Sequence, residues 1–282
     1  MSDAALAARD FFGGTLGGMA GILAGHPLDT AKTRLQAMQR FEHAGTYKVL
    51  SDTARHEGAR ALYKGMSFPL YSTALCNAVV FCVQGAAERW LTSALGDRPQ
   101  VTGFLGGCIA GLAQSPLVCA VDLVKTQRQV QFGEGRGPLQ ILRARAGAGL
   151  GFRGFFQGLG PTAVKECPSY GVYFLVYEES KRIFDQSKVP TVLATLGAGG
   201  LAGCFALGMI HPVDVVKSRI QSLPVEATAQ EADVWHVVTA GLRKEGFSFM
   251  LRGFGAAMQR AFVLNAATFG GYELAVAAWD KL

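Results

Sequence analysis

The chain has 282 residues, half of them hydrophobic, and its mean hydropathy is +0.23. Only 17% of the residues are charged, and the net charge is +6 with an isoelectric point near 9.1. This composition excludes a disordered chain, disfavours an ordinary soluble domain and makes a membrane protein the first class to test.

Six apolar stretches follow one another along the chain. Three of them contain no Asp, Glu, Lys or Arg and exceed the roughly 20 residues that a helix needs to cross the hydrocarbon layer. The first stretch is shorter, and two more are interrupted by a few charges. In chain order the stretches are 11–28, 65–87, 99–121, 154–177, 189–213 and 253–272. We predict six transmembrane helices.

Glycines gather inside these stretches, in runs such as 13–18 and 103–111. In water such runs would weaken a helix, whereas in lipid a small residue at every fourth position lets two helix backbones approach closely. The glycine pattern therefore predicts close helix pairs within a membrane.

An enzyme would need a nucleophile with its base, a metal set or a phosphate loop, and none of these patterns is visible. The six cysteines lack metal-ligand spacing. His26 and His211 occupy matching positions before a proline, which indicates framework residues. We expect no catalytic residue, no cofactor and no metal. The basic residues lie at helix ends and not on one soluble face, so we expect anionic lipid and not nucleic acid beside them.

An acid and a base recur three times at nearly equal spacing along the chain. Each pair follows an apolar, glycine-rich stretch, and a glutamine follows each base about one helical turn later. The pairs are Asp29 with Lys32, Asp122 with Lys125 and Asp214 with Lys217, and the glutamines are Gln36, Gln129 and Gln221. An aromatic or aliphatic residue, a polar residue and a glycine recur later in each copy, at 63–65, 156–158 and 251–253. We interpret residues 1–282 as one transmembrane domain of three repeats, about 8–95, 98–187 and 190–282.

This threefold pattern resembles the mitochondrial carrier family, whose signature P-x-[DE]-x-x-[KR] ends each odd-numbered helix. The similarity runs from about Asp10 to Lys281. It implies an all-α membrane protein with six transmembrane helices in three pseudo-threefold repeats, each with a short matrix helix. It also implies a multi-pass protein of the mitochondrial inner membrane, with a peroxisomal membrane the less favoured location. A monomer that contacts membrane lipid, cardiolipin in particular, is the further expectation.

Two positions depart from the pattern of the family. Ala120 replaces the second signature proline, so the third long helix should kink less sharply than the first and the fifth. Leu150 stands where the other repeats have Glu57 and Glu245.

By resemblance, the three signature acids pair with lysines of neighbouring repeats and close the matrix side. Gln36, Gln129 and Gln221 would brace these pairs. The cytoplasmic counterpart, [FY]-[DE]-x-x-[KR], is complete only where Glu178 and Lys181 follow Tyr177. Its equivalents are reduced to Gln84 and Glu273, so we expect at most one ion pair in a cytoplasmic gate.

A metabolite lacks threefold symmetry, so its site should lie where the repeats differ. Aligning the even-numbered helices on the three glycines of the tripeptides places Ser72, Lys165 and Arg260 at one level, with Thr73, Glu166 and Ala261 next to them. The three charged side chains among them fall roughly mid-membrane at 1.5 Å per residue, where transporters of this kind hold substrate. Adjacent helix positions do not face each other, which disfavours a simple bridge between Lys165 and Glu166. An unpaired guanidinium would be costly there, so Arg260 should meet either Glu166 or a substrate carboxylate.

These charges favour a zwitterionic substrate, with its carboxylate on Arg260 and its ammonium on Glu166. The fourth and sixth helices are similar to those of carnitine/acylcarnitine and ornithine-type carriers. The second helix offers Ser72, Thr73 and Asn77 but no second acid, which favours carnitine esters or neutral amino acids. The alternatives are a carrier of ornithine, lysine or arginine, and a carrier-like adaptor without transport.

Overall fold

The computed structural model describes residues 3–96, 98–132, 135–147, 151–186, 191–228 and 230–279. Within these ranges the chain forms helices and connecting segments and no strand. The long helices, which alternate in direction, are α1 (Asp3–Ala37), α3 (Ser67–Leu95), α4 (Pro99–Val130), α6 (Leu159–Gln186), α7 (Thr191–Ser222) and α9 (Phe254–Trp279). The all-α class and the three-repeat arrangement expected from the sequence are confirmed.

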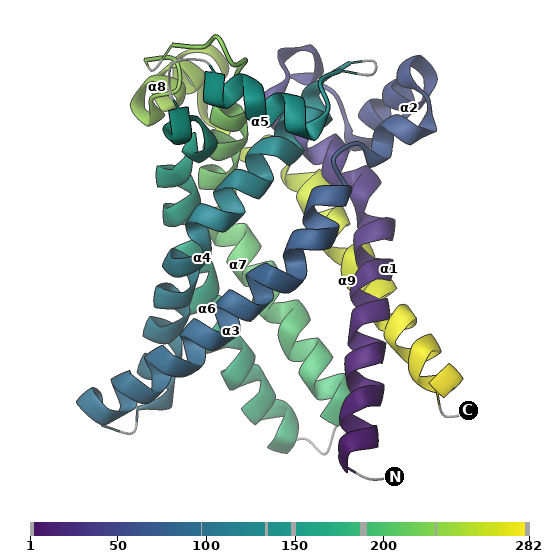
Figure 1. The fold of residues 1–282 in the computed structure, drawn as a ribbon, viewed down its shortest axis with the longest axis vertical. Helices are drawn as coiled ribbons and strands as arrows, with labels where there is room; N and C mark the ends of the chain where they lie inside the picture. The colour runs from purple at the N-terminus through teal and green to yellow at the C-terminus, as the bar shows by residue number, and fades with distance from the viewer. Residues whose placement is uncertain are drawn as a thin grey trace.

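Short helices gather at one end of the molecule, at the top of Figure 1. They are α2 (Thr46–Glu57), α5 (Pro138–Gly147) and α8 (Val234–Glu245), with the 3-10 segments η1 (Gln39–Phe41), η2 (Ala59–Tyr63), η3 (Gly151–Phe156) and η4 (Gly246–Leu251). The glycine of each repeated tripeptide lies in the turn before α3, α6 or α9. Its φ is between +72° and +84°, a backbone conformation that favours glycine. The long helices approach one another at this closed end and diverge toward the opposite, open end, where both termini lie (Figure 1).

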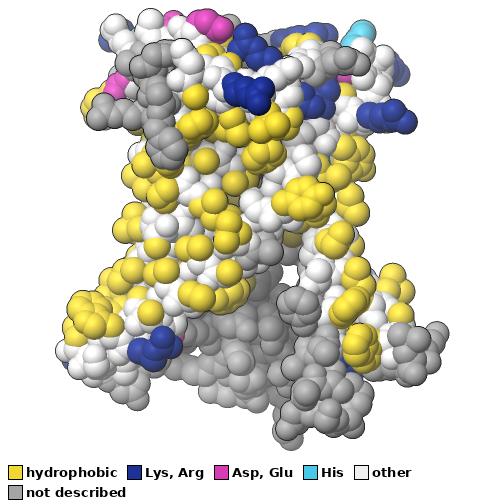
Figure 2. Space-filling view, in the orientation of Figure 1, with side chains coloured by type: hydrophobic (Ala, Val, Ile, Leu, Met, Phe, Trp, Pro, Cys, Tyr) yellow, Lys and Arg dark blue, Asp and Glu magenta, His cyan; other side chains and the backbone are white. Residues whose placement is uncertain are grey.

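On the face shown in Figure 2, hydrophobic side chains cover much of the described surface of the long helices, and most of the visible charged side chains gather at the closed end. Among the described residues, the helical segments Ala59–Leu95, Gln100–Val130 and Val234–Trp279 are long and apolar enough by themselves to cross a membrane. The remaining long helices, α1, α6 and α7, run through the same depth of the molecule (Figure 1). Together the six long helices form the spanning layer.

Glycines bring two pairs of these helices into backbone contact. A Cβ atom at Gly17 of α1 would lie 2.5 Å from the carbonyl oxygen of Thr268 in α9. A Cβ atom at Gly111 of α4 would lie 2.4 Å from the carbonyl oxygen of Glu166 in α6. No side chain fits into such gaps, so the close helix pairs predicted from the glycine runs are confirmed for α1 with α9 and for α4 with α6.

Gly111→Ala should destabilise the protein, because its Cβ must push α4 away from the α6 backbone. Overpacking of this kind costs about 1–3 kcal/mol. Gly160→Ala is the matched control, since a Cβ at Gly160 of α6 meets no atom within 4 Å. Thermal unfolding of the detergent-purified protein should show a lower midpoint for Gly111→Ala alone. Equal midpoints for the two variants would refute the close packing of α4 on α6.

Candidate functional site

Six symmetric charges close the short-helix end. Each signature aspartate contacts the lysine of another repeat, because the ends of α1, α4 and α7 meet around the axis of the bundle. The pairs are Asp29 with Lys125 (2.6 Å), Asp122 with Lys217 (2.5 Å) and Asp214 with Lys32 (2.5 Å). We call these six residues the charge ring. The carboxylates of Asp29 and Asp214 are each 7% exposed, so the ring lies in a largely desolvated environment.

Two of the three glutamines brace the ring as expected. The Gln129 amide donates to Asp29 at 2.9 Å, and the Gln36 amide donates to Asp214 at 3.3 Å. Gln221 departs from the expectation and donates to the backbone carbonyl of Cys119 at 3.3 Å. Cys119 is smaller than the histidine at this position in the other repeats, and the Gln221 amide also lies 3.7 Å from its sulfur.

The two histidines are framework residues in the structure. His26 lies 3.1 Å from the carbonyl oxygen of Lys64, and His211 lies 3.0 Å from that of Arg252. Both acceptors are the middle residues of the repeated tripeptides. His26 therefore ties α1 to the turn that opens α3, and His211 ties α7 to the turn that opens α9.

Two asymmetric cations contact ring acids. Nε of Arg260 lies 2.7 Å from Asp29, and Nζ of Lys165 lies 3.3 Å from Asp214. The predicted contact of Arg260 with Glu166 is therefore wrong, because α9 places Arg260 beside α1 and not beside α6. The contact of Arg260 with Asp29 is an ion pair in which the buried Nε makes no hydrogen bond, and the Arg260 side chain as a whole is 31% exposed.

The bridge that helix geometry disfavoured does form between Lys165 and Glu166, at 3.2 Å. Adjacent helix positions do not face each other because their Cβ atoms point in different directions. The long, flexible side chain of Lys165 nevertheless carries Nζ to a point between Glu166 and Asp214. The other carboxylate oxygen of Glu166 accepts from the Gln114 amide at 3.1 Å. Glu166 is thus satisfied by protein groups and only 7% exposed in this conformation.

The ring and its neighbours carry an excess of positive charge. The five cations are Lys32, Lys125, Lys165, Lys217 and Arg260, and the four anions are Asp29, Asp122, Glu166 and Asp214, which gives 5 − 4 = +1. An uncompensated charge at membrane depth is costly. The cluster is therefore suited to receive an additional anionic group.

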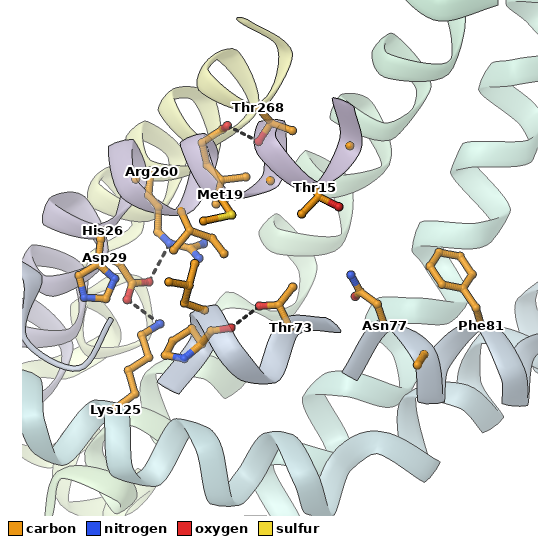
Figure 3. A pocket seen from close by; sticks show the side chains of 18 residues that line it. Thr15, Met19, His26, Asp29, Thr73, Asn77, Phe81, Lys125, Arg260 and Thr268 are labelled. Atoms are coloured by element: carbon orange, nitrogen blue, oxygen red, sulfur yellow. Dashed lines mark hydrogen bonds and ion pairs between the residues drawn. The ribbon is translucent and has the colours of Figure 1, made fainter. Parts of the chain in front are cut away.

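Two cavities meet at this cluster. The larger, of about 880 Å³, lies between α1, α3 and α9 and includes Thr73, Asn77 and Phe81 in its wall (Figure 3). The smaller, of about 150 Å³, is lined mainly by ring charges and by Lys165. Arg260 lines both cavities. Ser72 is half-buried, and its hydroxyl lies 3.5 Å from the Pro69 carbonyl oxygen.

The open end shows no closed gate among the side chains that the structure describes. Gln84 is buried against α4, with its amide 3.5 Å from the Gly103 carbonyl oxygen, and Glu273 is exposed. The side chains of Glu178 and Lys181 lie outside the described part of the chain. The cytoplasmic gate therefore stays a prediction.

An outer layer of charges, which the sequence analysis did not identify, ties the short helices to the ring helices. Glu57 binds Arg34 of α1 and, at 2.7 Å, Lys64. Glu245 repeats this arrangement with Arg219 (2.6 Å) and Arg252 (2.8 Å). The recurrence of these charges in the first and third repeats was the signal available in the sequence.

The second repeat lacks this triad. Gln127 and Gln157 replace the two bases, and Leu150, which replaces the glutamate, lies outside the described residues. The fully buried guanidinium of Arg145 instead donates to the side chain of Gln157 and, at 2.6 Å, to the Leu223 carbonyl oxygen. A single arginine thus connects α5 to the end of α7.

Glu57 generates a pH-dependent contribution to stability. Burial would raise the pKa of its carboxyl, but the hydrogen bonds and charges of Arg34 and Lys64 outweigh burial and lower the pKa. A lowered pKa stabilises the folded state above the ordinary glutamate pKa of about 4.3, and this stabilisation is lost as pH falls through the folded-state value. Glu57→Gln should cost about 1.5–3 kcal/mol at pH 7 through the lost charge-assisted bonds.

The measurement is the thermal unfolding midpoint of the native protein and of Glu57→Gln, from pH 7 down to pH 3. The difference between their midpoints should shrink at the acidic end. A difference that is constant with pH would show that the Glu57 charge contributes nothing.

Comparison with known proteins adds independent findings. A family model described as "Mitochondrial carrier protein" matches residues 4–95, 96–188 and 188–281. The chain is 37% identical to the mitochondrial basic amino acids transporter of Bos taurus, over 93% of this chain and 89% of that protein. It is 34% identical to a mitochondrial arginine transporter of Arabidopsis thaliana, over 95% and 90% of the two chains. It is 33% identical to a mitochondrial carnitine/acylcarnitine carrier-like protein of the same plant, over 94% and 96%.

Proposed function

Because the chain belongs to the mitochondrial carrier family, we propose that it carries basic amino acids across the inner membrane by alternating access. Membership of this family makes it a multi-pass protein of the mitochondrial inner membrane. The observation that carries the choice of substrate is the 37% identity to a basic amino acids transporter over nearly the whole chain. The basic amino acid alternative thereby replaces the sequence-based preference for carnitine esters or neutral zwitterions.

The charge ring acts as the matrix gate of this carrier. Three ion pairs hold the matrix ends of α1, α4 and α7 together while the opposite end stays open. Desolvation of the charges offsets much of their mutual attraction, so the net closing energy is on the order of a few kcal/mol. The differential binding of a small substrate can overcome a gate of that strength.

The substrate carboxylate binds Arg260. Arg260 and Lys125 both line the two cavities, and the Arg260 side chain is the more exposed, at 31% against 16%. A carboxylate can approach Arg260 through the larger cavity, past Thr73 and Asn77. Once the carboxylate takes up Arg260, Asp29 keeps only Lys125 as a close cation among the described residues. Substrate binding therefore changes the charges around one pair of the gate.

Lys165, Glu166 and Ser72 complete the site at the same level of the membrane. Lys165 is shared between Glu166 and Asp214, so a substrate ammonium that binds Glu166 must first displace Lys165. This displacement would transfer Lys165 fully to Asp214. Binding and rearrangement of the charges are thus coupled at a second ring acid.

We also propose that the chain is one domain that works as a monomer in contact with cardiolipin. In the same proposal, Glu178 and Lys181 form the core of the cytoplasmic gate. The activity shared by the relatives is transport and not catalysis. A carnitine or acylcarnitine carrier is the second candidate, supported by the 33% identity to a carnitine carrier-like protein.

Liposomes containing the purified protein should take up lysine, arginine or ornithine in preference to carnitine, neutral amino acids and dicarboxylates. The measurement is uptake of each radiolabelled compound at equal concentration, with protein-free liposomes as the control. Carnitine as the best substrate would favour the second candidate, and a dicarboxylate as the best substrate would refute recognition of a cationic group.

Arg260→Ala should remove the preference for a free carboxylate, because no other partly exposed guanidinium contacts the ring within the described residues. A charge-assisted pair is worth about 1.5–3 kcal/mol, or about 10- to 100-fold in apparent affinity. Inhibition of lysine uptake by unlabelled lysine and by lysine amide measures that preference in the native protein and the variant.

Arg260→Lys separates charge from shape, since it keeps a cation but loses the planar fork. It should fall between the native protein and Arg260→Ala. An unchanged preference for lysine over lysine amide in Arg260→Ala would make Arg260 a structural partner of Asp29 and leave Lys165 as the carboxylate reader.

A further inference from the structure

The three ring acids are not equivalent. Asp29 contacts Lys125 and Arg260, and Asp214 contacts Lys32 and Lys165. Asp122 makes one ion pair with the described residues, to Lys217. Its side chain is 27% exposed, against 7% for each of the other two acids.

Repeat symmetry explains the difference. Arg260 of the third repeat contacts the acid of the first repeat, and Lys165 of the second contacts the acid of the third. By the same relation, symmetry assigns position 72 of the first repeat to Asp122 of the second, and position 72 is a neutral serine. We therefore infer that the position that supplies a second cation to Asp29 and to Asp214 supplies none to Asp122.

A second, independent feature leaves Asp122 accessible. The glutamine that should brace it by symmetry, Gln221, donates instead to the carbonyl of Cys119. Asp29 by contrast accepts from Gln129 in addition to its cations. Asp122 faces the smaller cavity, whose volume of about 150 Å³ suits the charged end of a side chain.

We propose that Asp122 binds the side-chain cation of the transported basic amino acid, a proposal that rests on the proposed function above. It supplies the second acid that a dibasic substrate needs and that α3 lacks at Ser72, Thr73 and Asn77. The substrate then takes the place of the missing cation of the first repeat. With the carboxylate at Arg260 and the side-chain cation at Asp122, the substrate engages one ring acid, Asp122, directly and a second, Asp29, through the contact that Arg260 makes with it.

Specificity follows from this arrangement. A neutral amino acid can occupy Arg260 but leaves the pair of Asp122 with Lys217 intact, so it weakens the matrix gate less. A basic side chain competes with Lys217 for Asp122 and loosens the contact between α4 and α7. Recognition of the cation and release of the gate are then the same event.

The test is Ser72→Lys, which should place a second cation beside Asp122 and so compete with the side-chain cation of the substrate. Lysine and norleucine are the probes, because they share the backbone and the length of the side chain and differ in the terminal ammonium group. The native protein should prefer lysine, and Ser72→Lys should reduce the ratio of lysine to norleucine uptake at least about tenfold, the equivalent of one charge-assisted pair. Ser93→Lys, the same exchange at an exposed position near the open end of α3, should keep the native ratio.

Binding is measured beside uptake in case a variant inserts but does not transport. Stabilisation of the detergent-purified protein against heat should be greater with lysine than with norleucine for the native protein and for Ser93→Lys, and equal for Ser72→Lys. Glu166→Gln should weaken both ligands and preserve their ratio if Asp122 reads the side chain.

The outcomes separate the two levels of the proposal. If the native protein prefers lysine and Ser72→Lys retains that preference in uptake and in binding, Asp122 is not the side-chain site although basic amino acid transport stands. If Glu166→Gln alone abolishes the preference, Glu166 reads the side-chain cation and the assignment to Asp122 is wrong. A native protein without preference for lysine over norleucine would overturn the proposed function and this inference together.

Discussion

The structure depends on one constraint, which is that charges at membrane depth must be neutralised inside the helix bundle. Each signature aspartate forms its ring ion pair with a lysine of another repeat. One repeat cannot satisfy its own charges, and three copies can do so by closing around an axis. The convergence of the long helices at one end, and the positions of α2, α5 and α8 there, follow from this closure (Figure 1).

The same acids serve two purposes in this account. Asp29 and Asp214 hold the ring lysines and also hold Arg260 and Lys165, the cations that differ between repeats. A substrate that engages Arg260 or Lys165 must change the electrostatic surroundings of the ring. We propose that transport is coupled to the gate through these shared carboxylates, without a separate relay between binding site and gate.

The sequence predicted the threefold framework because its features repeat. Spacing alone indicated the ring acids and bases, and the glycine runs indicated close helix pairs without indicating which helices pair. The partners of unrepeated residues could not be predicted in this way, since they depend on packing between repeats. Arg260 contacts Asp29 because α9 lies beside α1, Lys165 reaches Glu166 through a flexible stem, and Gln221 turns to Cys119 where other repeats carry a histidine. Arg145 compensates for a triad missing from the second repeat, which only the folded chain reveals.

Substrate binding should loosen the charge ring, and the separation of α2 from α8 at the matrix end reports on this loosening. Spin labels at the exposed positions Tyr47 and Trp235, in a cysteine-depleted protein in nanodiscs, allow that separation to be measured by electron paramagnetic resonance. Saturating lysine should move part of the population to longer separations in the native protein and not in Arg260→Ala. An identical distance distribution with and without lysine, in a protein that transports lysine, would contradict this loosening of the ring.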